Sequence, residues 1–256
     1  MDMKKVTVLG SGRLLGFALA ALIAITMWAP RANAADVIVL DSTISAFSPG
    51  TSLPANAYVD IPAGGSISLM DSAGSTRVLR GPYTGAVASD APAGDGGVMS
   101  MLGQLVKEDE RERSQLGAVR AFAKDDMLRD PLAIDVSRNT TFCLPPEASP
   151  KFWRPGSLDR DTRFSVKDWS SSDEPLVAYW RKGDRELGWP PTLSTADGTT
   201  FVMKVEAARS AAEVTILKVP EDVGGDLETI VWMAQHGCRE QARRMVGSIR
   251  GPVDTQ

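Results

Sequence analysis

Cys143, Cys238 and His236 are the residues that could support redox, metal or nucleophilic chemistry, since the chain has two cysteines and one histidine. A redox-active pair is typically Cys-x-x-Cys, whereas these cysteines lie far apart in the sequence. His236 and Cys238 are two positions apart and therefore face different sides of a helix. One histidine and two distant cysteines do not by themselves supply the ligands of a zinc site. The sequence therefore predicts no catalytic residue, no cofactor and no metal site.

A nucleotide-binding loop is suggested by Gly10 and Gly12, which follow a short β-prone run. The dinucleotide fingerprint needs a third glycine three residues after the second, but Leu15 stands there and Gly16 comes one residue late. Residues 14–29 are almost continuously apolar, whereas the helix of a nucleotide-binding fold has a polar face. A nucleotide site is therefore not expected.

The same segment has the three parts of a secretory signal peptide, which we assign to residues 1–34. Basic residues precede the apolar run, and Ala32-Asn33-Ala34 is a small-x-small cleavage site. The alternative is a retained membrane anchor, but the apolar run is shorter than the about 18 to 20 residues that span a bilayer. We therefore expect cleavage between Ala34 and Ala35, a periplasmic or secreted protein, and no stable membrane anchor.

The charge of the exported chain argues against a nucleic-acid partner. Cleavage lowers the basic residues from 28 to 24 and the acidic residues from 32 to 31, which gives a formal charge of −7. The few basic clusters have acidic neighbours, so the sequence shows no electrostatic footprint for a phosphate backbone.

Both cysteines lie in the exported part, where the environment is oxidising. A single disulfide between Cys143 and Cys238 is the simplest prediction. In the chain-entropy model, a bond closing so long a loop stabilises the fold by roughly 4 to 5 kcal/mol. The alternative is two independent buried thiols.

Residues 35–87 have the pattern of short strands separated by turns. The run 66–69 alternates strictly, and the DSAGS turn at 71–75 leads into 76–79, so we expect a hairpin in which Gly74 adopts a positive φ.

A family resemblance covers residues 37 to 85, whose core reads LPANAYVDIPAGGSISLMDSAGSTRVLRGPYTG. This order of turns, strands, D-x-x-G hairpin and closing Leu-x-Gly-Pro resembles the FecR-type periplasmic domain. The resemblance implies a β-sandwich or roll. Members of that family signal through a spanning helix and a cytoplasmic tail that acts on a sigma factor. This chain has no second apolar run, so the signalling role is not carried over.

The remaining chain divides into a linker with a helical connector at 88–130 and an α+β domain at 131–250. The helix at 99–123 contains KEDERER, which is polar all round and predicts a solvated connector; a partner-docking helix is the alternative. The α+β domain is predicted to contain a strand, a Lys-Gly-Asp turn and a strand at 175–191, then a hairpin at 197–220. A single helix at 226–246 closes it, with Asp226 as N-cap. The fold class is α+β and mostly β.

Tryptophan offers the best indication of a binding surface, because all five tryptophans after the signal segment fall in the 131–250 domain. An indole ring suits both cores and interfaces. Trp169 is flanked by charged residues and serines, so we expect it to be exposed. We select Trp169 and Trp189 as ligand or partner contacts.

Three hypotheses for function follow. The first is a non-catalytic exported protein that binds another envelope protein, in envelope sensing or scaffolding. The second is a cell-wall or polysaccharide binder that uses exposed tryptophans. The third is a hydrolase with a carboxylate pair, whose spacing depends on the fold.

Export can be tested directly. The mature protein recovered from the periplasm should begin at Ala35 when its N-terminus is sequenced, because the small residues of 32–34 fit signal peptidase. Recovery of an intact Met1 terminus in the membrane fraction would instead establish an anchor.

Overall fold

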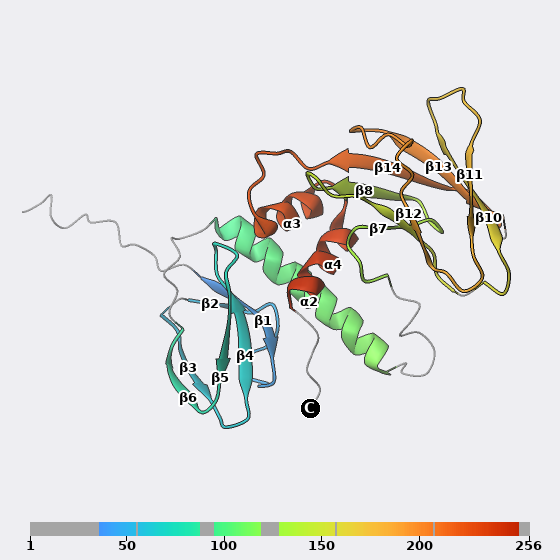
Figure 1. Cartoon of the computed structure of the whole chain (residues 1–256). Helices are drawn as coiled ribbons and strands as arrows, with labels where there is room; N and C mark the ends of the chain where they lie inside the picture. Colours follow the sequence, from blue (N-terminus) through green and yellow to red (C-terminus); the bar gives the residue numbers. More distant parts are fainter. Residues whose placement is uncertain are drawn as a thin grey trace, which may run out of the picture. The chain divides into compact units, whose positions relative to one another are not determined.

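A computed structural model of the chain describes residues 36–54, 56–87, 95–118, 128–156, 158–206 and 208–250 (Figure 1). The predicted signal peptide, its cleavage between Ala34 and Ala35, and most of the linker after residue 87 lie outside these residues. Strands outnumber helices in the described part, so the prediction of an α+β, mostly β fold is confirmed. No helix of the described residues is long and apolar enough to cross a membrane.

The described N-terminal residues form six strands: β1 (Val37–Ser42), β2 (Ser52–Leu53), β3 (Tyr58–Ile61), β4 (Ser66–Met70), β5 (Thr76–Arg80) and β6 (Tyr83–Ala86). Four of them make a sheet in the order β2-β1-β4-β5, and β3 pairs with β6. The predicted β4–β5 hairpin is confirmed, with Gly74 at φ 77° in its turn. β1 is apolar on both faces: Val37 and Val39 join one core, whereas Ile38 and Leu40 join another.

From residue 128 onward, the part of the chain that the structure describes contains eight strands: β7 (Ala133–Asp135), β8 (Thr140–Leu144), β9 (Lys151–Trp153), β10 (Thr162–Asp168), β11 (Leu176–Trp180), β12 (Glu186–Gly188), β13 (Thr200–Val205) and β14 (Ala212–Lys218). They build a five-stranded sheet, β11-β10-β13-β14-β8, and a three-stranded sheet, β12-β9-β7. Phe164 and Phe201 from the first sheet share a core with Ile134 and Phe152 from the second. The predicted β13–β14 hairpin is confirmed.

The two strands predicted within 175–191 are present as β11 and β12, but they belong to different sheets. β11 pairs with β10, whereas β12 pairs with β9. Trp180 at the end of β11 and Leu187 in β12 both contribute to the core between the sheets. The chain therefore crosses from one sheet to the other at the turn around Gly183.

Three helices lie in the described residues: α2 (Gly96–Ala118), α3 (Asp226–Gln235) and α4 (Arg239–Ile249). The prediction of one helix over 226–246 is wrong, because Gly237 takes a left-handed φ of 88° and separates α3 from α4. Such a glycine is a common helix end, and here the Cys238 N–H donates to the carbonyl of Met233 at 2.9 Å. Asp226 is the first helical residue rather than the N-cap, which is Gly225.

One apolar core joins all three helices to both β parts. It contains Ile38 and Leu40 of β1, Leu102 of α2, Ile230 of α3 and Val246 of α4. The described residues all fall in one compact unit. Residues 35–87 and 131–250 therefore contribute side chains to the same core.

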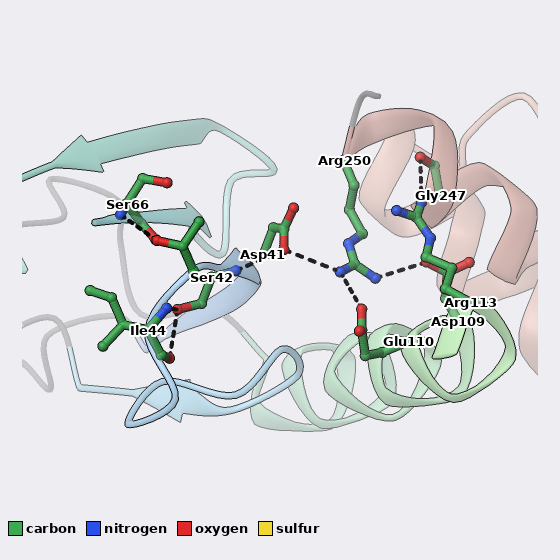
Figure 2. A network of polar contacts seen from close by, with 10 residues as sticks. Asp41, Ser42, Ile44, Ser66, Asp109, Glu110, Arg113, Gly247 and Arg250 are labelled. Atoms are coloured by element: carbon green, nitrogen blue, oxygen red, sulfur yellow. Dashed lines mark hydrogen bonds and ion pairs between the residues drawn. The ribbon is translucent and has the colours of Figure 1, made fainter. Parts of the chain in front are cut away.

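A polar network beside this core ties β1, α2 and α4 together (Figure 2). The side chain of Arg250, at the end of α4, is 1% exposed and contacts Asp109 and Glu110 of α2 at 2.8 Å each. It also lies 3.7 Å from Asp41 of β1. Asp109 pairs in addition with Arg113, one turn further along α2, at 2.9 Å.

Two further ion pairs, Arg239 with Glu108 and Arg243 with Glu112, join α4 to the charged middle of α2. The hydrogen bonds from Arg239 lower the pKa of Glu108. The prediction of a solvated connector is therefore wrong, because the KEDERER segment docks against α4.

The predicted disulfide between Cys143 and Cys238 is confirmed and links β8 to the start of α4. Gln241, one turn into α4, adds a second attachment. Its side-chain oxygen accepts the Cys143 N–H at 2.9 Å, and its amide nitrogen donates to the Cys143 carbonyl at 2.7 Å. The helix thereby supplies β8 with the hydrogen bonds that a neighbouring strand would have provided.

Replacing Gln241 by Leu should lower the free energy of unfolding by about 2 to 4 kcal/mol, because both backbone groups of Cys143 lose their partner in a buried place. Denaturant unfolding of the oxidised protein measures the change. The matched control is Gln235→Leu at the exposed end of α3, which should change stability by less than about 0.5 kcal/mol. Equal effects of the two variants would contradict the assigned role of Gln241.

Candidate binding surface

The two tryptophans selected from the sequence lie on opposite faces of the five-stranded sheet. Trp169 is 69% exposed. Trp189 is half-buried, with its ring centroid 4.9 Å from that of Phe152 and 5.4 Å from that of Phe201, and its Nε1 donates to the Leu193 carbonyl at 3.1 Å. Since Phe201 belongs to the core between the sheets, Trp189 lies on the core side.

β10 places Trp169 on the outer face by simple alternation. Phe164 and Val166 of this strand point into the core, so Ser165 and Lys167 lie on the other face. The Trp169 N–H donates to the Thr200 carbonyl at 2.9 Å, which continues the β10–β13 ladder past the end of the strand. Trp169 therefore follows Lys167 on the same face.

β11 adds two exposed apolar side chains to this face. Tyr179 lies opposite Arg163 and is 60% exposed, and Val177 lies opposite Ser165 and is 41% exposed. Sequence reasoning missed both. The signal that could have found them is the alternation within LVAYW, in which Trp180 is fully buried and its neighbour Tyr179 must face outward.

β13 completes the surface on the other side of β10. Lys204 lies opposite Ser165, and Val202 lies opposite Lys167. We call these outward-facing residues of three adjacent strands the aromatic–cationic strip; its members are Arg163, Ser165, Lys167, Trp169, Val177, Tyr179, Val202 and Lys204. Along β10 it extends about 20 Å, at roughly 3.3 Å per residue.

The strip carries more positive than negative charge. Among the ion pairs of the described residues, none includes Arg163, Lys167 or Lys204. Two carboxylates lie on the same face. An oxygen of Glu206 accepts a hydrogen bond from the backbone N–H of Arg163 at 3.4 Å, and Glu213 lies opposite Val202 on β14. Lys167 and Lys204 have the neutral residues Val202 and Ser165 opposite them on the adjoining β13 and β10.

α3 and α4 cover only one end of this outer face. Cys143 of β8 and Leu217 of β14 pack into the apolar core that contains the three helices, so helices cover the sheet at this end. The strip lies on the strands farther from β8, where Val177 and Tyr179 of the outermost strand β11 remain exposed. Figure 1 shows α3 and α4 near β8 and β14, away from β10 and β11.

A separate polar cavity of about 120 Å³ lies between β8 and the start of α4, and Cys238 contributes to its wall. Its carboxylates, Asp135 and Glu240, are both ion-paired with Arg138. Burial alone would lower the pKa of Arg138, but the hydrogen bond and charge of Glu240, together with Asp135, outweigh it and raise that pKa. Burial lowers the pKa of Arg244, one of the three arginines that line the cavity. The cavity is well below the roughly 300 Å³ at which drug-sized ligand sites begin.

His236 and Cys238 do not form a joint site. Cys238 is bonded to Cys143, and the His236 ring stacks on Trp232 with centroids 3.9 Å apart. Within the described residues there is no group of three or more histidine, cysteine or acidic side chains that could hold a metal ion.

Comparison of the chain with protein-family models, with curated proteins and with solved structures finds no match. The FecR-like resemblance of residues 37 to 85 therefore remains a prediction from the sequence.

Trp169→Phe should remove most of the tryptophan fluorescence that acrylamide quenches readily, because Trp169 is exposed whereas Trp153 and Trp180 are buried. Stern–Volmer titration of the variant against the unmodified chain measures this fraction. Trp189→Phe is the control and should leave the accessible fraction nearly unchanged. A larger loss in the control than in Trp169→Phe would show that the outer face is covered.

Proposed function

We propose that this chain is an exported, non-catalytic binding protein of the cell envelope and that the aromatic–cationic strip is its binding surface. The observation that supports this most strongly is the joint exposure of Trp169, Val177 and Tyr179 on neighbouring strands. Val177 and Tyr179 lie two positions apart on β11, and Trp169 lies farther along the same face, past the end of β10. Large apolar side chains that gather on one face of a folded domain mark interaction sites, whereas single scattered ones do not.

The chemistry of the strip favours binding over catalysis. It offers indole and phenol rings, ammonium and guanidinium groups, and the Ser165 hydroxyl. The described part of the chain places no histidine or cysteine on it, because His236 and Cys238 lie at the junction of α3 and α4. Aromatic faces and cations recognise a ligand by stacking and by charge, without a proton transfer.

The envelope location rests on two independent features. The N-terminal segment has the pattern of a cleaved signal peptide. The Cys143–Cys238 bond fits a compartment in which disulfides persist. We include the FecR-like assignment of residues 37–85 in the same proposal, since such domains belong to periplasmic proteins.

The test is cosedimentation of the purified protein with isolated cell envelopes. Trp169→Ala combined with Tyr179→Ala should weaken binding at least about fivefold, because aromatic residues dominate most interfaces. The matched control is Tyr58→Ala, which removes a ring that is 73% exposed on β3, away from the strip. Unchanged binding by the double variant, or an equal loss in the control, would exclude the strip as the binding surface.

A further inference from the structure

We infer that the aromatic–cationic strip binds a linear acidic polysaccharide, one that carries carboxylates on its sugar units. This inference rests on the proposed function, because it names the ligand class of the same surface. Three properties of the strip support it: its extended shape, the position of its rings and its unpaired cations.

The shape of the strip fits an extended chain. Its β10 residues run from Arg163 to Trp169 on one pleated face, and the side chains of β11 and β13 border this row on either side. A row of about 20 Å has no enclosed pocket for a compact small molecule. A polymer lying along β10 would contact the whole row.

The two aromatic residues stand near opposite ends of the row. Tyr179 lies beside Arg163 at one end, and Trp169 occupies the other end. Both rings are more than half exposed. A pyranose presents flat C–H faces as well as hydroxyl edges, so a broad ring with a polar edge suits it. The two rings could therefore contact two separated sugar units of one chain.

The cations lie between and beside the rings. Lys167 precedes Trp169 by two positions, and Lys204 lies opposite Ser165 in the middle of the row. Elsewhere, Arg138, Arg239 and Arg250 are held in ion pairs. The strip thus keeps Lys167 and Lys204 available to anions, although the chain as a whole has a formal charge of −4. Carboxylates on successive sugar units would complement this arrangement.

An acidic peptide fits the strip less well. An extended peptide usually binds by pairing its backbone with the free edge of a sheet. In the described residues β11 pairs only with β10, so such a peptide would lie beside β11. The rings and cations of the strip instead project from the face of the sheet, across β11, β10 and β13. These side chains can bind a ligand whose sugar rings stack on the aromatic residues and whose charges pair with the cations.

The experiment is isothermal titration of the full exported protein with three probes: an oligomer of galacturonic acid, a neutral glucan oligomer of the same length, and polyglutamate. We expect the acidic oligosaccharide to bind most tightly and its affinity to fall as salt screens the charges. The double variant Lys167→Gln with Lys204→Gln should bind the acidic oligosaccharide roughly three- to tenfold more weakly. Lys107→Gln with Lys218→Gln is the control, because it removes two exposed lysines outside the strip and should have little effect.

Trp169→Ala should lower the affinity for the acidic oligosaccharide, whereas any weak affinity for polyglutamate should stay unchanged. Equal affinity for the neutral oligomer would overturn the role of the cations. The carbohydrate assignment would be overturned in favour of an acidic peptide if polyglutamate bound as tightly as the galacturonic acid oligomer and its binding did not depend on Trp169. If none of the three probes binds, the polysaccharide assignment is overturned. The proposed function still stands in that case, provided that Trp169→Ala with Tyr179→Ala weakens binding to envelopes. Retention of envelope binding by that double variant would instead exclude the proposed function.

Discussion

The attachment of α4 to β8 is the interaction on which the other parts of the structure depend. The Cys143–Cys238 bond and the two hydrogen bonds from Gln241 converge on one residue of β8, which is an edge strand of the five-stranded sheet. From this position α4 presents Arg239 and Arg250 to α2, and α2 packs on β1. One buried contact therefore connects the C-terminal sandwich to the N-terminal strands through two helices.

The elements that the sequence predicted correctly are those specified by local signals. The DSAGS turn specifies the β4–β5 hairpin, and the alternation within β4 determines which of its residues face the core. The two cysteines leave only one intrachain disulfide. The break at Gly237 and the docking of KEDERER on α4 were missed, because a glycine within an apolar helical pattern and a charged helical segment each fit more than one tertiary setting. Only the packing partner decides between these settings.

Only part of the binding surface could be predicted from the sequence, because some of its residues depend on tertiary packing rather than on local signals. Trp169 has polar neighbours, which indicate exposure without knowledge of the fold. Tyr179 and Val177 lie in a strand that reads as an ordinary half-buried element, and their exposure depends on where α3 and α4 end. Trp189 has a sequence context like that of a surface residue, but a crossing between sheets brings its ring against Phe152. Sheet order is a long-range property that periodicity does not encode.

The position of Arg250 has a consequence for the order in which the molecule can assemble. Asp41 leaves the ribosome long before Arg250, by roughly 10 to 40 s at ordinary rates of synthesis. During that interval the strands of residues 37–86 can pair with one another and α2 can cover Ile38 and Leu40 of β1, but Asp109 and Glu110 of α2 have not yet met Arg250. These two carboxylates therefore stay without their buried cation until the last residues of the described chain arrive, and the docking of α4 is the step that neutralises them.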